Sequence, residues 1–219
     1  MLNIALVLKS GGRYTRDWVI RLANQVDTYL DLDHRFVVFT DEPAADFGPR
    51  FVVIPLNDGL PGWWSKMEIF RPGLFKERER VLYLDLDTLA LGSLNEIAGY
   101  DGTFAALADF TRPEVVGTGV MAFRTSPLTA TLFQSFTADV ADGMLLRTRP
   151  ALPGDQDYVT AKIGGSVQRL QTLYPEQIVS YKVHGCEEAP ITGARLCCFH
   201  GDPKPDNEGG WAQAMWEAA

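Results

Sequence analysis

The stretch RVLYLDLD, residues 80–87, constrains the fold more than any other part of the sequence. After Arg80 it is apolar at odd and even positions alike until it reaches Asp85 and Asp87. Strands buried on both faces have this pattern, and they lie at the centre of parallel sheets that are covered by helices. Burying two carboxylates is costly unless a partner offsets the cost. The stretch therefore predicts an α/β sheet with a charged site at its edge.

The segments around this strand fit the same sheet. Residues 3–9 and 35–40 are predicted strands, and residues 15–30 between them have apolar side chains at helical spacing. This strand–helix–strand order is typical of parallel α/β sheets. The remaining predicted strands are 50–56, 102–109, 118–124, 177–182 and 195–201, and the predicted helices are 62–75, 127–143, 154–165 and a tail helix expected to dock on the core. Neither a repeat nor a linker divides the sequence, which predicts a single domain over residues 1–219.

Composition excludes several classes of partner. The 219 residues contain 28 acidic and 20 basic side chains, and the net charge of −8 disfavours a nucleic-acid binder or an anionic-membrane binder. No apolar run approaches the ~20 residues that a transmembrane helix needs, and the apolar N-terminus is predicted to be a strand. The three cysteines, Cys186, Cys197 and Cys198, make a poor disulfide framework. They favour a reducing, cytoplasmic location.

The two aspartates are the first candidate site. Ligands of open parallel sheets bind beyond the carboxyl ends of the strands, where Asp85 and Asp87 are expected. Two neighbouring carboxylates repel each other, and a bound Mg²⁺ or Mn²⁺ removes that repulsion. The pattern alone also fits a strand-end turn with two solvated aspartates.

Other segments add groups of suitable chemistry. In CCFHGDPKP, residues 197–205, His200 is a candidate for completing a cation site, and Gly201 with Lys204 is a candidate for binding phosphate. Lys66 is a second candidate for contact with an anion. Further candidates are Asp109 at a predicted strand end and Gln156 and Asp157 at a predicted helix start. Each of these features alone also fits an ordinary cap, turn or exposed side chain.

The order of these segments is that of a known family. WWSKMEIF, RVLYLDLDTLALGSL, ALAD, GTGVMAF, GDQDYV and FHGDPKP follow one another over roughly residues 60–205, after the strand IALVLKSGG. The chain resembles the metal-dependent glycosyltransferases of the GT-A fold, most closely glycosyltransferase family 8 and its bacterial relatives. The resemblance implies a Rossmann-like fold with a mixed, mostly parallel central sheet flanked by helices.

The resemblance also implies roles for individual residues. The metal, Mn²⁺ or Mg²⁺, would be bound by Asp85, Asp87 and His200. The nucleotide-sugar donor, by default a UDP-sugar, would contact Lys9, Ser10, Gly11, Gly12, Lys66, Asp85, Gly201 and Lys204. Asp109 would bind hydroxyls of the donor sugar, and Gln156 and Asp157 would face the reacting carbon and the acceptor. The implied activity is transfer of a hexose with retention of configuration. Two departures from the family pattern are Thr118, where asparagine is usual, and the absence of a tryptophan after Lys204-Pro205.

Two other functions fit parts of the sequence. YLDLDTL also matches the motif of haloacid-dehalogenase-type phosphatases, in which Asp85 would be the nucleophile and Asp87 the acid–base group. That family's motif usually lies near the N-terminus, and the phosphatase hypothesis leaves FHGDPKP unexplained. The second alternative is a non-catalytic sugar-nucleotide binder, or an enzyme that needs a partner. The acceptor (glycan, lipid or protein), the donor sugar and the oligomeric state are not readable from the sequence.

Overall fold

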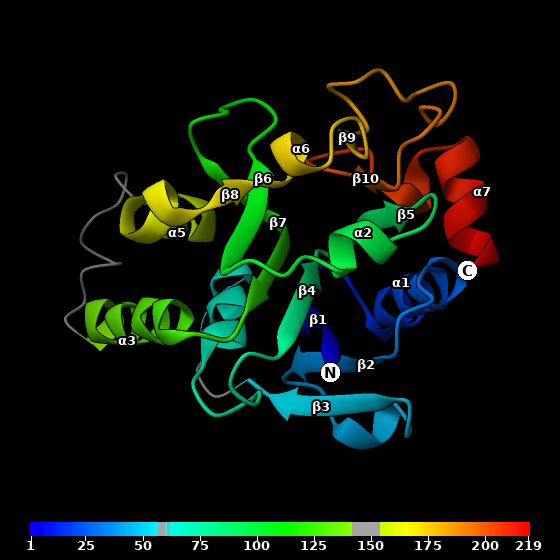
Figure 1. Ribbon diagram of the computed structural model, residues 1–219. Helices are drawn as coiled ribbons and strands as arrows, with labels where there is room; N and C mark the ends of the chain where they lie inside the picture. Colours follow the sequence, from blue (N-terminus) through cyan, green and yellow to red (C-terminus); the bar gives the residue numbers. More distant parts are fainter. Residues whose placement is uncertain (57–59, 61, 142–153) are drawn as a thin grey trace.

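The structure is a computed structural model that describes residues 1–56, 60, 62–141 and 154–219. Within these residues the main sheet has seven strands in the order β3-β2-β1-β4-β7-β6-β8 (Figure 1). The strands are β1 (Leu2–Leu8), β2 (His34–Thr40), β3 (Phe51–Pro55), β4 (Arg80–Leu84), β6 (Phe104–Ala108), β7 (Val116–Arg124) and β8 (Gln168–Arg169). The predicted α/β class and the central position of the strand that begins at Arg80 are confirmed.

Strand direction determines where a site can form. β3, β2, β1 and β4 are parallel to one another, whereas β7 is antiparallel to both β4 and β6. β6 in turn pairs parallel with β8. The carboxyl ends of four neighbouring parallel strands therefore meet at one edge, as ligand binding in an open α/β sheet requires.

Helices cover both faces of the sheet. The helices include α1 (Arg16–Tyr29), the four-residue α2 (Asn95–Ala98), the 3₁₀ helix η2 (Gly62–Phe70), α3 (Pro127–Ala141), α5 (Asp155–Ile163) and α7 (Trp211–Ala218). Leu82 and Leu84 of β4 belong to the cluster packed on α1 and α2, whereas Val81 and Tyr83 belong to the cluster under η2, α3 and α5. Successive strand residues point to opposite faces. Both faces of β4 are therefore buried, which explains its unbroken apolar sequence.

A second, three-stranded sheet brings the C-terminal part of the chain to the ligand-binding edge. Its strands, in spatial order, are β5 (Thr88–Ala90), β10 (Leu196–Cys198) and β9 (Ile178–Ser180). β10 is antiparallel to β5, and Cys198 pairs with Thr88. Because antiparallel chains continue past each other, Asp87 just before β5 lies beside the residues that follow β10. His200 and Lys204 come from that segment.

The remaining short elements are η1 (Ala44–Asp46), η3 (Gly164–Ser166), α6 (Leu170–Leu173) and η4 (Pro205–Asn207). The tail helix α7 docks as expected and lies beside α1 (Figure 1). The Trp216 ring lies 5.0 Å from the Trp18 ring, and the Arg21 guanidinium lies over Trp216.

The structure differs from the sequence prediction mainly at boundaries. The helix predicted over 62–75 is a 3₁₀ helix that ends at Phe70, and the separate strand β5 was not predicted. The last two residues of the helix predicted over 127–143 lie outside the described residues. In the part of the chain that the structure describes, no helix combines the length and apolarity needed to cross a bilayer.

Candidate functional site

Asp85 directly follows β4 and joins a buried charge network beneath η2. The Lys66 Nζ atom lies 2.9 Å from Asp85 Oδ1 and 3.2 Å from Asp155 Oδ2. Thr118 on β7 donates its hydroxyl to Asp155, and the Tyr83 hydroxyl donates to Asp85 Oδ1 at 2.5 Å. Lys66 is only 7% exposed and Asp155 only 4%. One buried ammonium group is therefore shared by two carboxylates, of which Asp155 is buried and Asp85 has a side chain that is 35% exposed.

The Lys66 ammonium remains charged in this setting. Burial lowers the pKa of Lys66, but the carboxylates of Asp155 and Asp85 outweigh burial and hold that pKa above its usual value. Thr118 Oγ1 also lies 3.2 Å from Lys66 Nζ and accepts a hydrogen bond from it. The network gives Asp85 a fixed orientation at the end of its strand.

Asp87 is paired by residues from two distant segments. Its Oδ2 atom accepts a hydrogen bond from the Tyr14 hydroxyl at 2.7 Å and forms an ion pair with Lys204 Nζ. Tyr14 lies between β1 and α1, whereas Lys204 follows β10. Burial and the nearby Asp87 carboxylate raise the pKa of Tyr14, so its hydroxyl stays protonated and donates. The second aspartate is thus 7% exposed and is paired through Oδ2.

His200 lies near the same edge. Its Nε2 atom is 2.7 Å from Ser180 Oγ, and its ring stacks against Phe110 with 6.1 Å between centroids. Burial and the positive charge of Lys182 lower the pKa of His200. The imidazole is therefore neutral near pH 7, and neutral imidazole is the form that binds metals.

The predicted metal ligands do not form a compact group in this conformation. Among the described residues, no three His, Cys, Asp or Glu side chains gather closely enough to hold a metal ion. Asp87 is instead paired with Lys204 and Tyr14, and His200 is hydrogen-bonded to Ser180. The donor chemistry nevertheless fits, because two carboxylates and a neutral imidazole line one cavity and suit Mn²⁺ or Mg²⁺. Metal binding therefore stays a prediction.

The loop after β1 is anchored to Asp41, which follows β2. Asp41 accepts hydrogen bonds from Lys9 Nζ at 2.5 Å, from the Ser10 hydroxyl at 2.7 Å and from the Ser10 amide at 2.8 Å. Gly11 has φ +80°, a conformation that favours glycine, and it turns the loop back toward α1. These bonds fix Lys9 and Ser10 at the edge of the sheet, as predicted for a nucleotide contact. Gly12 continues this loop, and Gly201 has φ +65° in the segment after His200.

The three predicted catalytic residues lie at this edge but differ in their contacts. Asp109 Oδ1 accepts hydrogen bonds from Thr111 and from the Arg112 amide, and these bonds lower the Asp109 pKa against the effect of burial. Asp157 Oδ1 lies 3.1 Å from Arg112 Nη1. Gln156 Oε1 is buried and has no hydrogen-bond partner among the described residues. Gln156 therefore has a buried acceptor left for a ligand.

Three cavities meet at Asp85. The large cavity has a volume of about 650 Å³ and is lined by Val7, Lys9, Ser10, Gly11, Gly12, Arg13, Tyr14, Gly62, Trp63, Lys66, Tyr83, Asp85, Leu86 and Asp87. The aspartate cavity, about 130 Å³, is lined by Asp85, Asp87, Thr88, Leu107, Asp109, Phe110, Thr111, Gly117, Gly119, Gln156, Cys198, Phe199 and His200. The tryptophan cavity, about 270 Å³, is lined by Trp63, Lys66, Asp85, Arg112, Gly154, Asp155, Gln156 and Asp157. Most of the predicted site residues therefore line contiguous space.

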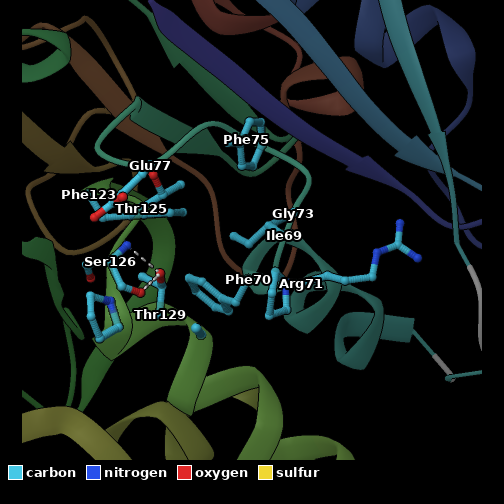
Figure 2. A pocket seen from close by; sticks show the side chains of 13 residues that line it. Ile69, Phe70, Arg71, Gly73, Phe75, Glu77, Phe123, Thr125, Ser126 and Thr129 are labelled. Carbon is cyan, nitrogen blue, oxygen red and sulfur yellow. Dashed lines mark hydrogen bonds between the residues drawn. The ribbon is translucent and has the colours of Figure 1, made fainter.

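A further cavity of about 290 Å³ lies away from the carboxylates. Figure 2 shows its wall, which includes Phe70 and Phe123 and the hydrogen-bonded pair of Ser126 and Thr129. β7 is antiparallel to β4, so Phe123 lies beside the start of β4, whereas Asp85 follows its end. This cavity is thus at the opposite edge of the sheet and lacks a cluster of acids and bases, apart from Glu77 and Arg71.

Sequence reasoning missed several residues of the site. Asp155, Tyr14, Tyr83, Asp41 and Ser180 carry no signal in the sequence that marks them as site residues. A buried aspartate at a helix start is indistinguishable in sequence from an ordinary cap. Only the contact with Lys66, 89 positions away in the chain, identifies Asp155 as part of the network.

Comparisons with known proteins agree with the fold. No protein-family model matches the sequence, and no curated protein matches it. The glycosyltransferase GlyE of Streptococcus pneumoniae is similar in structure, with a TM-score of 0.72 and 14% identity over 98% of this chain and 59% of that one. The galactosyltransferase LgtC, solved with donor and acceptor sugar analogues, has a TM-score of 0.67 and 14% identity over 98% of this chain and 94% of its own. The bifunctional glycosyltransferase WbbM has a TM-score of 0.64 and 13% identity over 94% of this chain and 47% of its own.

The chain has the fold of these glycosyltransferases. The predicted fold class is therefore confirmed. At this level of identity the likeness concerns the fold alone, since one fold hosts many activities. The chain spans about three-fifths of the length of GlyE.

Proposed function

We propose that the chain is a metal-dependent glycosyltransferase that transfers a hexose from a UDP-sugar to an acceptor, with retention of configuration. One observation carries the proposal. At the carboxyl edge of β1 and β4, two carboxylates, two lysines and a neutral histidine surround cavities that meet at Asp85. On a fold shared with glycosyltransferases, this is the set of groups that a nucleotide diphosphate and its cation require.

The residues that would hold the metal are Asp85, Asp87 and His200. When bound, Mn²⁺ or Mg²⁺ supplies Lewis-acid stabilisation of the negative charge that develops on the departing diphosphate. Lys204 forms an ion pair with Asp87. We therefore expect its ammonium group to donate a hydrogen bond to a diphosphate oxygen when the donor binds beside Asp87.

The remaining groups would bind and orient the donor. Lys9 and Ser10, fixed by Asp41, would contact the nucleoside in the large cavity. Lys66 orients Asp85 and Asp155, whose oxygens can accept hydrogen bonds from sugar hydroxyls. Electrostatic groups fixed in advance around a developing charge lower the barrier without reorganising during the reaction. Asp109, Gln156 and Asp157 would face the transferred sugar and the acceptor.

The structure gives less support to the alternatives. The phosphatase hypothesis needs Asp85 as a free nucleophile. In the structure Asp85 forms an ion pair with Lys66 and accepts a hydrogen bond from the Tyr83 hydroxyl. The hypothesis also assigns no role to Lys204 beside Asp87. A non-catalytic sugar-nucleotide binder would use the same site, and turnover distinguishes it from an enzyme.

The proposal is tested by thermal unfolding with UDP, UDP-glucose and UDP-galactose, each with Mn²⁺, with Mg²⁺ and with chelator. A ligand at a hundred times its Kd stabilises the folded state by about 2.7 kcal/mol. For a chain of this size that corresponds to a rise in Tm of roughly 5–10 °C. We expect this rise only with the metal present, together with slow metal-dependent release of UDP from the sugar nucleotide. If no nucleotide raises the Tm with metal present, the proposal is wrong. If nucleotides bind but no UDP is ever released, with or without candidate acceptors, the binder hypothesis is favoured.

A further inference from the structure

Two adjacent tryptophans on η2 have opposite environments. Trp64 is 9% exposed and stacks on Phe136 with 5.8 Å between ring centroids. Trp63 is 61% exposed, and it is the only aromatic among the exposed large hydrophobic side chains of the described residues. Trp64 thus completes the core, whereas Trp63 leaves a large flat apolar surface uncovered.

The exposed indole forms one wall of the tryptophan cavity. Arg112 lies on the cavity lining with it, and Lys66, Asp85, Asp155 and Gln156 contribute polar groups. An added Cβ on Gly154 would lie 3.2 Å from Trp63 Nε1, so the absence of a side chain there leaves room beside the indole. Gln156 Oε1 is buried without a donor, and a hydroxyl group in the cavity would satisfy it.

The charges of the cavity indicate an uncharged occupant. Lys66 is already balanced by Asp85 and Asp155, and Arg112 lies 3.1 Å from Asp157. An acidic sugar would therefore meet no uncompensated cation among these lining residues. A neutral pyranose has an apolar face that suits the indole and hydroxyl groups that suit the carboxylates and Gln156.

We infer that Trp63 is the stacking platform for the pyranose ring of the donor and a determinant of donor-sugar binding. This inference rests on the proposed function. The tryptophan cavity shares Trp63, Lys66 and Asp85 with the large cavity, so a single molecule can extend from one into the other. A nucleotide in the large cavity then places its sugar against Trp63.

The test measures binding of UDP, UDP-glucose and UDP-galactose by calorimetry in the presence of Mn²⁺. The variants are Trp63→Ala, Trp63→Phe and Leu173→Ala, the last removing an exposed apolar side chain outside these cavities. The wild type should prefer one of the two UDP-hexoses. We expect Trp63→Ala to bind that preferred donor about tenfold more weakly than the wild type does. The variant's affinity for UDP should change less than twofold. Trp63→Phe should keep most of the hexose affinity, and Leu173→Ala should match the wild type.

Three results would overturn the inference. Equal weakening of UDP and UDP-hexose would mean that Trp63 contacts the nucleotide. If Trp63→Ala binds both donors as tightly as the wild type does, Trp63 takes no part in donor binding. The same conclusion holds if the variant raises only the KM of an acceptor. A wild-type protein that binds neither UDP nor UDP-hexose with Mn²⁺ would overturn the proposed function as well, which separates the two failures.

Discussion

At the scale of single residues, Lys66 is the side chain on which most of the charged site depends. Its buried ammonium group pairs with both Asp85 and the buried Asp155. Removing one partner from a buried ion pair costs about 3–5 kcal/mol because the remaining charge is left without compensation. We expect Lys66→Met to lower the free energy of unfolding by about 3 kcal/mol in urea titrations. Adding Asp155→Asn should recover part of that loss, and a loss below 1 kcal/mol in the single variant would contradict this account.

Asp87 tests the proposed metal site. Asp87→Asn keeps the shape of the side chain and a hydrogen-bond acceptor for Tyr14, so we expect the fold to persist. It removes one of the charges that would bind the cation, and metal-dependent stabilisation by UDP should disappear in thermal unfolding. Asp33→Asn, at an exposed carboxylate just before β2 and so at the opposite edge of the sheet, is the matched control and should behave like the wild type. Wild-type affinity in Asp87→Asn would exclude Asp87 from the site.

Lys204 tests the proposed contact with the diphosphate. Charge-assisted hydrogen bonds to phosphate are about twice as strong as neutral ones. We expect Lys204→Met to weaken UDP by about tenfold or more in calorimetry with Mn²⁺, while uridine binding stays unchanged. The same variant frees Asp87 from its ion pair. Equal losses for UDP and uridine would mean that Lys204 does not touch the phosphates.

At the scale of elements, the sequence was informative wherever burial leaves a periodic pattern. The apolar run before Asp85 predicted β4 and its end, and helical spacing predicted α1. Short elements held by partners elsewhere in the chain escaped prediction. β5 has three residues and exists because β10 pairs with it. Likewise η2 is a 3₁₀ helix whose aromatic residues pack on the sheet, and its sequence alone suggested an α-helix.

The start of α7 depends on one carboxylate. Glu208 accepts hydrogen bonds from the Tyr181 hydroxyl at 2.6 Å, from the Gly210 amide at 2.8 Å and from the Ala212 amide at 3.2 Å. Burial raises the pKa of Glu208, but these bonds outweigh it and lower that pKa below its usual value. A carboxyl whose pKa is lower in the folded state than in the unfolded state stabilises the protein at any pH above its unfolded-state pKa. That stabilisation is lost as the pH falls through the pKa that the carboxyl has in the folded protein.

We therefore expect Glu208→Gln to lower the free energy of unfolding by about 1 kcal/mol at pH 7, because a neutral amide accepts these hydrogen bonds less strongly than a carboxylate does. The difference between variant and wild type should shrink as the pH falls below about 4.5, where the wild-type carboxyl also becomes protonated. Urea titrations at pH 7, 5 and 3.5 measure it. A difference that stays constant over this range would mean that the charge of Glu208 does not support α7.

At the scale of the whole molecule, the site joins segments that are far apart in the sequence. The loop after β1, Lys66, the aspartates after β4 and the segment after β10 all border contiguous cavities. The sequence indicated each of these segments, because each has its own small motif. It could not show that Lys204 pairs with Asp87, because that contact depends on the pairing of β10 with β5. It also could not show that Lys66 joins Asp155, because that contact depends on the packing of η2 beside α5.

This arrangement predicts how the molecule responds to its ligand. One molecule of UDP with Mn²⁺ would contact residues 9–14, 85–87 and 200–204 at once, so binding should suppress opening of all three segments together. Hydrogen exchange measures this directly, because amides exchange through such local openings. We expect slower exchange in peptides from all three segments when UDP and Mn²⁺ are added. Peptides over 70–77 and 123–130, which line the cavity of Figure 2 at the opposite edge of the sheet, should be unaffected. Protection confined to the loop after β1 would mean that the C-terminal segment takes no part in binding, and protection around the opposite cavity would place the nucleotide there instead.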